Sequence, residues 1–292
     1  MTIFLSILIA LLIERVFDQL KTMRGFNWLA RYTHWMTEVL HIDRLGSWMA
    51  FALLFVPLLI ATWMLDGIFD NALFGLFELG FNVLVVFACL GPKDLDQQID
   101  FYIDAVETGS DSEKINAAKR IAGDNVAADL VDDLAEQVTQ VSKAIFVEAN
   151  RRLFAMIFWF LIMGPVGAVA YRLFEQFVNP QQSDEGLKAV KSKTRQLIAW
   201  LDWLPVHLTL FAYMVSGNFD AGMQSFRKLD KTAADMTEEN AEMLRQVGFS
   251  SIQVDTIDSN IAAVDCIRKS RGLVLRTLIV WVFFALMFAL LQ

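Results

Sequence analysis

The ten residues AWLDWLPVHL, at positions 199–208, place ionisable groups inside an apolar stretch. A charge at membrane depth is costly unless a partner or water offsets it, so Asp202 and His207 are candidate functional groups. Pro205 has no backbone N–H to donate within a helix. We therefore expect a helix to begin here, with Asp202 as its N-cap, Pro205 in its first turn and free N–H groups that favour an anion. The helical repeat separates two faces. One face carries Trp200, Trp203 and His207, and the other carries Asp202, Thr209 and Tyr213.

Charged residues also mark the ends of other apolar stretches. Interfacial ion pairs and topology signals explain such residues without a ligand. A converging cluster is the alternative, because charges from separate segments offset one another's insertion cost of about 2.5–3.5 kcal/mol each. Arginine also offers planar donor forks suited to carboxylate or phosphate. This alternative predicts an intramembrane pocket for a small anionic or zwitterionic ligand, lined by Glu14, Arg15, Glu148, Asn150, Arg151, Tyr171, Arg172, Asp202 and His207.

Glu78 and Asn82 form a further polar pair within an apolar stretch. Their spacing of four residues puts both on one helix face. Either they serve a function inside the membrane, or Glu78 lies close to the interface.

Several classes of site are not indicated. The sequence has no G-x-x-x-x-G-K-[ST] phosphate loop, no G-x-G-x-x-G after a strand, no H-E-x-x-H and no G-x-S-x-G. His34 and His41 could share a helix face, but too few ligands lie nearby for a metal site. Cys89 and Cys266 form neither a metal-binding spacing nor a disulfide framework. We therefore expect no catalytic set, no metal and no cofactor, and the absence of a strongly basic region argues against nucleic acid.

The elements that carry these residues are predicted to be membrane helices. Of the 292 residues 55% are hydrophobic, which is more than in ordinary soluble domains. Crossing a bilayer takes about 20 mostly apolar residues. Four stretches are long enough to cross: 47–65, 72–90, 153–174 and 273–291. Two weaker candidates, 2–17 and 196–216, are apolar but contain charged residues. Nothing indicates a strand, so we expect an all-α, polytopic helical bundle of at least four spans in the lipid bilayer.

The basic residues predict the orientation of this bundle. Residues 66–71 contain no Lys or Arg, whereas 18–46 and 91–152 contain several. The positive-inside rule then places 18–46 and 91–152 in the cytoplasm and 66–71 outside. The basic segment 217–271 is cytoplasmic only if 196–216 crosses the membrane or forms a deep re-entrant segment, so we expect one of these.

Residues 1–292 are expected to form one membrane domain with an acidic helical insertion at 91–152. Apolar residues recur at helical spacing in the insertion, at Leu95, Ile99, Tyr102 and Val106. A turn at 108–112 and a helix from near Ser112 should follow. After a break at Gly123, a third helix should run into the span at 153.

Three blocks of the chain together resemble the AmpE family, namely MTIFLSILIALLIERVF, VEANRRLFAMIFWFLIMGPVGAVAYRL and LIAWLDWLPVHLTLFAYMVSG. They carry the motifs I-E-R, E-x-N-R, G-P-x-G-A-x-x-Y-R and L-D-W-L-P-V-x-L in order. The resemblance covers nearly the whole chain. It implies an inner-membrane regulatory or sensory protein linked to β-lactamase induction and cell-wall state in Gram-negative bacteria, with a protein partner in that pathway.

The wider superfamily contains CbiB/CobD, the membrane-bound adenosylcobinamide-phosphate synthase. The framework of the synthases is matched at Glu148, Asn150 and Tyr171-Arg172. This chain departs from the synthases at polar positions, with Pro205-Val206-His207-Leu208 in place of Pro-Ala-Arg-Leu. The resemblance therefore implies a regulatory protein. The first alternative is an amide-forming enzyme or pseudoenzyme, and the second is a transporter or membrane scaffold.

Overall fold

A computed structural model gives the fold of the protein. It describes residues 1–16, 27–41, 45–69, 75–90, 95–123, 133–178, 187–229, 235–254 and 256–291. Within these ranges every regular element is a helix, which confirms the all-α prediction. The chain divides into two compact units.

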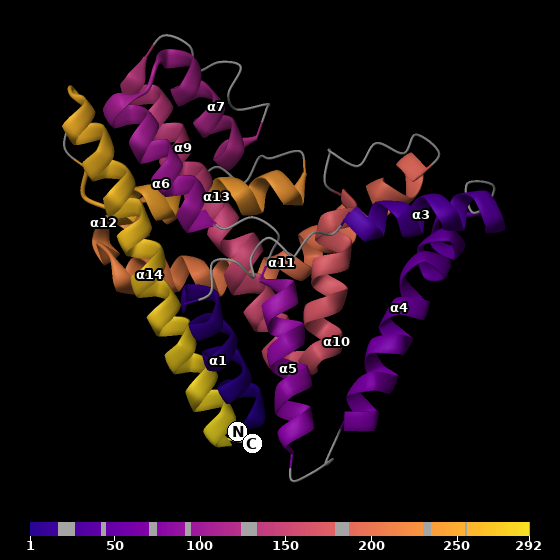
Figure 1. The fold of residues 1–292 in the computed structure, drawn as a ribbon. Coiled ribbons are helices and arrows are strands. Elements are labelled where there is room, and N and C mark those ends of the chain that lie inside the picture. Colours follow the sequence, from indigo (N-terminus) through magenta and orange to yellow (C-terminus); the bar gives the residue numbers. More distant parts are fainter. Residues whose placement is uncertain are drawn as a thin grey trace. The chain divides into compact units, whose positions relative to one another are not determined.

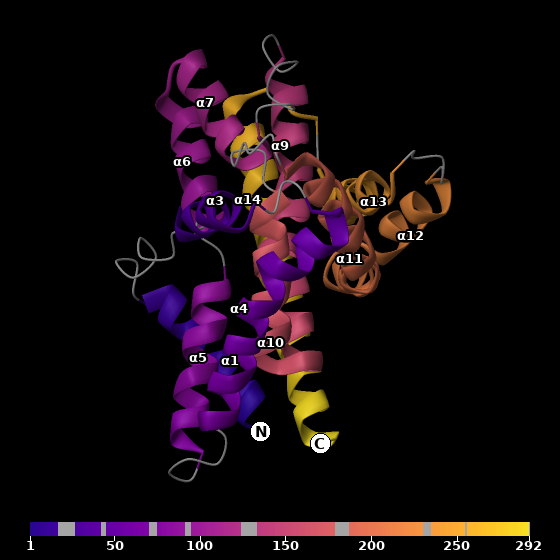
Figure 2. The ribbon, with the colours of Figure 1, turned by 90° about the vertical axis from the view of Figure 1, so that its right-hand side faces the viewer.

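The first unit comprises 1–92, 155–203 and 282–292. It contains α1 (Thr2–Val16), α3 (Asn27–Leu40), α4 (Ser47–Phe69), α5 (Leu76–Cys89), α10 (Ala155–Val178) and the first part of α11 (Lys188–Ser216). In this unit α5 packs against both α1 and α10, and α10 also packs against α4 (Figures 1 and 2).

The second unit comprises 93–154 and 204–281. It contains α6 (Leu95–Thr108), α7 (Asp111–Ala122), α9 (Leu134–Ala149), the π-helix η2 (Asn150–Phe154), α12 (Phe219–Lys228), α13 (Met236–Ser251) and most of α14 (Asn260–Leu291). Its helix α9 packs against α7 and α13, and α12 packs against α13.

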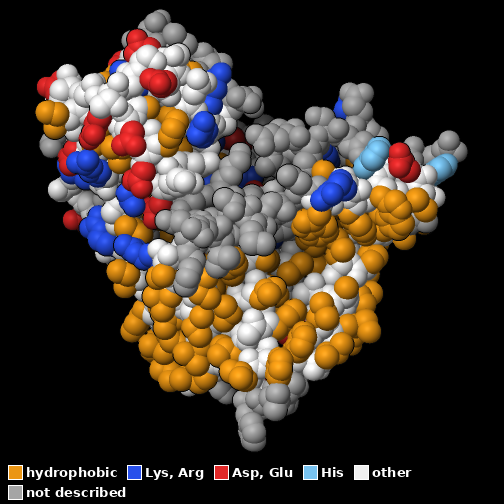
Figure 3. Space-filling model, in the orientation of Figure 1, with side chains coloured by type: hydrophobic (Ala, Val, Ile, Leu, Met, Phe, Trp, Pro, Cys, Tyr) orange, Lys and Arg blue, Asp and Glu red, His pale blue; other side chains and the backbone are white. Residues whose placement is uncertain are grey.

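Four helical stretches are long and apolar enough to cross a membrane: Ser47–Phe69, Leu134–Val178, Lys188–Ser216 and Asn260–Leu291. Helix α4 exposes large apolar side chains along its length, including Trp48 near its start and Trp63 near its end. In the first unit, hydrophobic side chains cover the surface over α4 (Figure 3). A helix that buries so little of its apolar surface in protein is suited to lipid, and the tryptophans suit the two interfaces. These helices mark the chain as a multi-pass membrane protein.

The predicted helix break lies in α10 instead of α11. Helix α11 continues through Pro205, so the expectation that Asp202 caps a new helix was wrong. The break occurs at Gly164, whose backbone adopts φ 62° and ψ −151° just before Pro165. That conformation is open almost only to glycine, and proline disfavours the helical conformation in the residue before it. Leu204, which precedes Pro205, has no such freedom and stays helical.

The insertion is helical, as predicted, with one shift in a boundary. The stripe of four apolar residues on α6 is buried. Helix α7 begins at Asp111, after Ser110, which forms a full capping box with Glu113, so the start predicted near Ser112 was one residue late. Helix α9 runs through η2 into α10, as expected, while the predicted start of this third helix falls in 124–132, outside the described residues.

Candidate functional site

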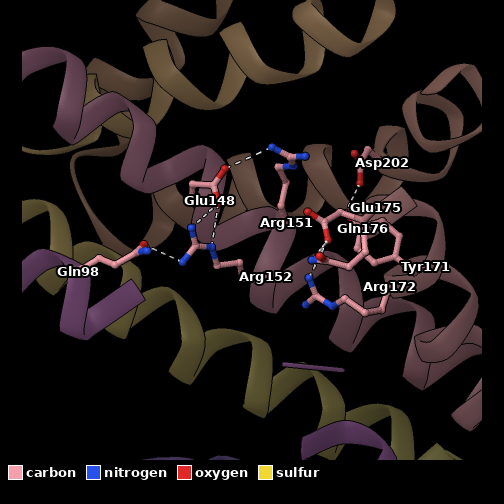
Figure 4. Close-up of polar contacts among 9 residues, drawn as sticks. All are labelled: Gln98, Glu148, Arg151, Arg152, Tyr171, Arg172, Glu175, Gln176 and Asp202. Atoms are coloured by element: carbon pink, nitrogen blue, oxygen red, sulfur yellow. Dashed lines mark hydrogen bonds and ion pairs between the residues drawn. The ribbon is translucent and has the colours of Figure 1, made fainter. Parts of the chain in front are cut away.

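Asp202 lies on the buried face of α11 and accepts a hydrogen bond from Tyr171 of α10. The Tyr171 hydroxyl donates to Oδ1 over 2.8 Å, and both side chains are buried (Figure 4). The predicted separation of faces is confirmed, because Trp200 and Trp203 are exposed on the opposite side of the helix. A buried carboxylate needs such donors, since its desolvation is otherwise uncompensated.

Arg172, one residue further along α10, is buried to 1% exposure. Its Nε donates to the carbonyl oxygen of Cys89 over 2.6 Å, at the last residue of α5. The final carbonyls of a helix lack intrahelical donors and carry partial negative charge, so a guanidinium there satisfies and stabilises the end of α5. Nη1 of Arg172 also donates to Glu175 over 3.1 Å, and Gln176 donates to the same carboxylate over 2.7 Å.

These five side chains, Tyr171, Arg172, Glu175, Gln176 and Asp202, are here called the α10–α11 cluster. All are buried, and they present one guanidinium, two carboxylates, an amide and a phenol (Figure 4). Glu175 and Gln176 were missed at the sequence level. Their spacing of three to five residues from Tyr171 and Arg172 on one helix was the available signal.

A second polar group lies in the second unit, around the end of α9. Glu148 binds Arg152 through Nε at 2.8 Å and Arg151 through Nη1 at 3.3 Å, which confirms the pairing expected from their spacing. Arg152 also donates to Gln98 of α6 over 2.9 Å (Figure 4). Gln98 was not predicted, because its contact bridges 54 positions of sequence.

Asn150 sits at the start of η2 and is buried. Its Oδ1 accepts from the Thr209 hydroxyl over 2.9 Å, and the Tyr213 hydroxyl donates to the carbonyl of Phe146 over 3.0 Å. The first contact joins α11 to the start of η2, and the second joins α11 to the last turn of α9 just before it. Single π-turns often occur at functional positions because they re-aim side chains.

The remaining predicted residues take other positions. Arg15 is exposed on the last turn of α1, with Glu14 half-buried before it, and His207 is half-buried on α11. Glu78 accepts a hydrogen bond from Thr2 over 2.9 Å, which ties α5 to α1. Asn82 is 3% exposed, and in the part of the chain that the structure describes its Oδ1 has no hydrogen-bond partner. Within the described ranges, no three His, Cys, Asp or Glu side chains are grouped as a metal site would need.

Comparison with known proteins supplies a family. The sequence model of the family described as "Regulatory signalling modulator protein AmpE" matches residues 1–290. The chain is also similar to a protein named "Cobalamin biosynthesis protein CobD" from Chromobacterium violaceum, at 25% identity over 193 residues. That match covers 63% of this chain and 56% of the relative, so the chain spans just over half the length of the curated relative it matches. No solved structure matches.

Proposed function

This chain belongs to the AmpE family of regulatory membrane proteins, and on that premise we propose that it regulates β-lactamase induction in response to cell-wall state by binding a small ligand at the α10–α11 cluster. The family match across residues 1–290 carries the regulatory part of the proposal. The cluster carries the ligand-binding part, because ionisable groups buried among membrane helices are costly and are retained where they serve a function.

The chemistry of the cluster favours a zwitterionic ligand over a purely anionic one. Arg172 offers a donor fork that fits a carboxylate or phosphate. Asp202 and Glu175 offer acceptors for an ammonium group. Since charges of both signs are buried together, a molecule carrying both signs would exchange with existing partners at little electrostatic cost. A wall-derived peptide with a free amine and carboxylate has this chemistry.

A complementation experiment tests the regulatory role. β-Lactamase induction is measured in a strain lacking its own copy of this gene, supplied with the wild-type chain, Tyr171→Phe or Thr194→Val. Tyr171→Phe removes the donor to Asp202 and should abolish the effect on induction. Thr194→Val is the matched control, because among the described residues the Thr194 hydroxyl donates to the carbonyl of Val190 in its own helix and to no other helix. Induction unchanged by Tyr171→Phe at equal protein level would contradict the role of the cluster.

Amide synthesis is the second candidate, because of the similarity to the CobD-named protein. We expect no such activity, since this chain lacks polar residues of the synthase pattern. For example, Pro205-Val206-His207-Leu208 stands in place of Pro-Ala-Arg-Leu, so that the arginine is absent. Growth of a strain lacking the synthase, on a medium without cobalamin, checks this expectation. Rescue by this chain would establish the enzymatic alternative.

A further inference from the structure

We infer that α10 is a re-entrant hairpin that enters and leaves the membrane on the cytoplasmic side, and that α11 lies in the membrane interface without crossing. By length and composition alone, both helices would pass as spans. The inference rests on which ends of neighbouring helices they contact, and it is independent of any ligand.

Helix α10 folds back on itself at Gly164. A Cβ on Gly167 would overlap the backbone oxygen of Trp159 and lie 2.6 Å from Cβ of Met163. In a straight helix, residues eight positions apart are separated by about 12 Å, so the two limbs of α10 must meet at a sharp turn. Figure 1 shows the second limb returning beside α5. At 1.5 Å per residue, this limb, Pro165–Val178, is about 21 Å long, short of the roughly 30 Å core of a bilayer.

The second limb ends beside the start of α4 and the end of α5. The ring of Phe174 lies 5.3 Å from that of Phe51 and 4.9 Å from that of Phe55, both in the first half of α4. Arg172 donates to the carbonyl of Cys89, the last residue of α5.

These neighbouring ends fix the side on which α10 leaves the membrane. The start of α4 follows 18–46 and the end of α5 precedes 91–152, the two segments assigned to the cytoplasm by their basic residues. Helix α10 itself continues from 91–152 through α9. Both of its ends therefore face the cytoplasm. A crossing helix would instead end beside Phe69 of α4 and Leu76 of α5.

Both ends of α11 also belong to the cytoplasmic side. In the first unit, Leu187 and Val190 are buried in one cluster with Leu29 of α3. The segment that follows α11 carries basic residues, among them Arg227, Lys228 and Arg245. The positive-inside rule therefore keeps this end of α11 on the cytoplasmic side as well.

The two faces of α11 match an interfacial helix. Its buried face carries polar groups, among them Asp202 and Thr209. From Trp200 onward, its exposed face carries a half-buried His207 beside a broad apolar stripe of Trp200, Trp203, Leu204, Leu208, Phe211 and Val215. The exposed polar residues of α11 lie in its first turns, namely Lys188, Ser192, Arg195 and Gln196. Exposed apolar side chains with tryptophan suit the acyl–headgroup boundary, so lipid is the partner of this face.

The basic residues agree with this topology more closely than with two further crossings. All 25 Lys and Arg residues lie in 15–44, 93–152 and 172–276, and none lies in the stretches that would face outward. A full crossing by α10 would expose a basic run outside, against the positive-inside rule, namely Lys188, Lys191, Lys193 and Arg195.

Cysteine accessibility tests the inference. Single cysteines replace Ser192, at the start of α11, and Gln224, on α12 after its end, in a chain carrying Cys89→Ala and Cys266→Ala. Ser110→Cys and Ile68→Cys mark the cytoplasmic and outer sides. Intact spheroplasts are treated with a membrane-impermeant maleimide, and labelling is compared before and after permeabilisation.

We expect the 192 and 224 cysteines to behave like the one at 110, labelled only after permeabilisation. Labelling at 192 alone in intact cells would mean that both helices cross, and labelling at 224 alone that α11 crosses. Labelling at both would mean that only α10 crosses, and each of these results overturns the inference. If the cysteine-free chain fails to accumulate, the reporters go into the wild-type chain, whose two cysteines are buried.

Discussion

At the scale of single residues, Asn82 of α5 is a buried polar group, only 3% exposed. Its Oδ1 has no hydrogen-bond partner among the described residues. Replacing an unsatisfied buried amide by an apolar group of similar size removes a penalty of about 1–3 kcal/mol. Asn82→Leu should therefore raise the free energy of unfolding measured by denaturation in detergent. Thr209→Val should lower it, because the side-chain oxygen Oδ1 of Asn150 loses its donor. If Asn82→Leu destabilises the protein, Asn82 has a polar role that the fold does not reveal.

Gly167 is constrained by close backbone approach, and Gly80 is not. A side chain at Gly167 would meet Trp159 and Met163 at the turn of α10, whereas no atom of the described ranges lies within 4 Å of a Cβ at Gly80. Gly167→Ala should cost about 1–3 kcal/mol through overpacking. Gly80→Ala should be neutral or stabilise by up to about 1 kcal/mol through helix propensity. Thermal unfolding of the purified variants measures both, and equal melting temperatures would argue against the hairpin.

At the scale of elements, the cap of α7 gives a pH prediction. Hydrogen bonds from the backbone N–H and hydroxyl of Ser110 lower the pKa of Glu113. A lowered folded-state pKa contributes stability above the unfolded value of about 4.3, and this contribution is lost as pH falls through the folded value. Thermal unfolding at pH 6 and pH 3 should show a larger loss for the wild type than for Glu113→Gln. Equal losses would mean that the cap does not stabilise the fold.

The helices were predictable from the sequence, but their breaks were only partly so. The length of an apolar run located α4, and apolar periodicity located α6 and its buried stripe, because run length, period and burial follow directly from side-chain type. The break was assigned to the Asp202–Pro205 stretch, from the missing N–H of the proline and from the capping preference of the aspartate. The structure puts it at Gly164-Pro165, where glycine supplies a conformation that proline by itself does not require. The choice between a break at Pro205 and one at Pro165 depends on tertiary packing, which cannot be read from the sequence of either helix alone.

The polar residues were located better than their partners. The sequence marked Tyr171, Arg172 and Asp202, because charge in apolar surroundings is conspicuous. It did not indicate that Arg172 stabilises the end of α5 at Cys89, since that contact joins positions 83 residues apart.

At the scale of the whole molecule, the inferred topology changes where the α10–α11 cluster lies. Arg172 is on the limb of α10 that returns to the cytoplasmic face, beside the end of α5. Its insertion cost is then lower than at the bilayer centre. If the proposed ligand and the re-entrant hairpin both hold, the ligand reaches the cluster from the cytoplasm. A membrane-impermeant wall peptide added to intact spheroplasts should leave the melting temperature of the protein unchanged. After permeabilisation, the same peptide should raise that melting temperature. Stabilisation before permeabilisation would place access on the outer side.

The central claim is that Asp202 serves regulation by binding a ligand and does not merely hold α10 to α11. Asp202→Asn keeps the size of the side chain and an acceptor for Tyr171 while removing the charge. The decisive measurement pairs β-lactamase induction in complemented cells with the melting temperature of the purified variant. We predict that induction control is lost while the melting temperature stays close to that of the wild type. A large fall in melting temperature, with induction reduced only in proportion to the amount of protein, would contradict the account and leave the cluster a purely structural one.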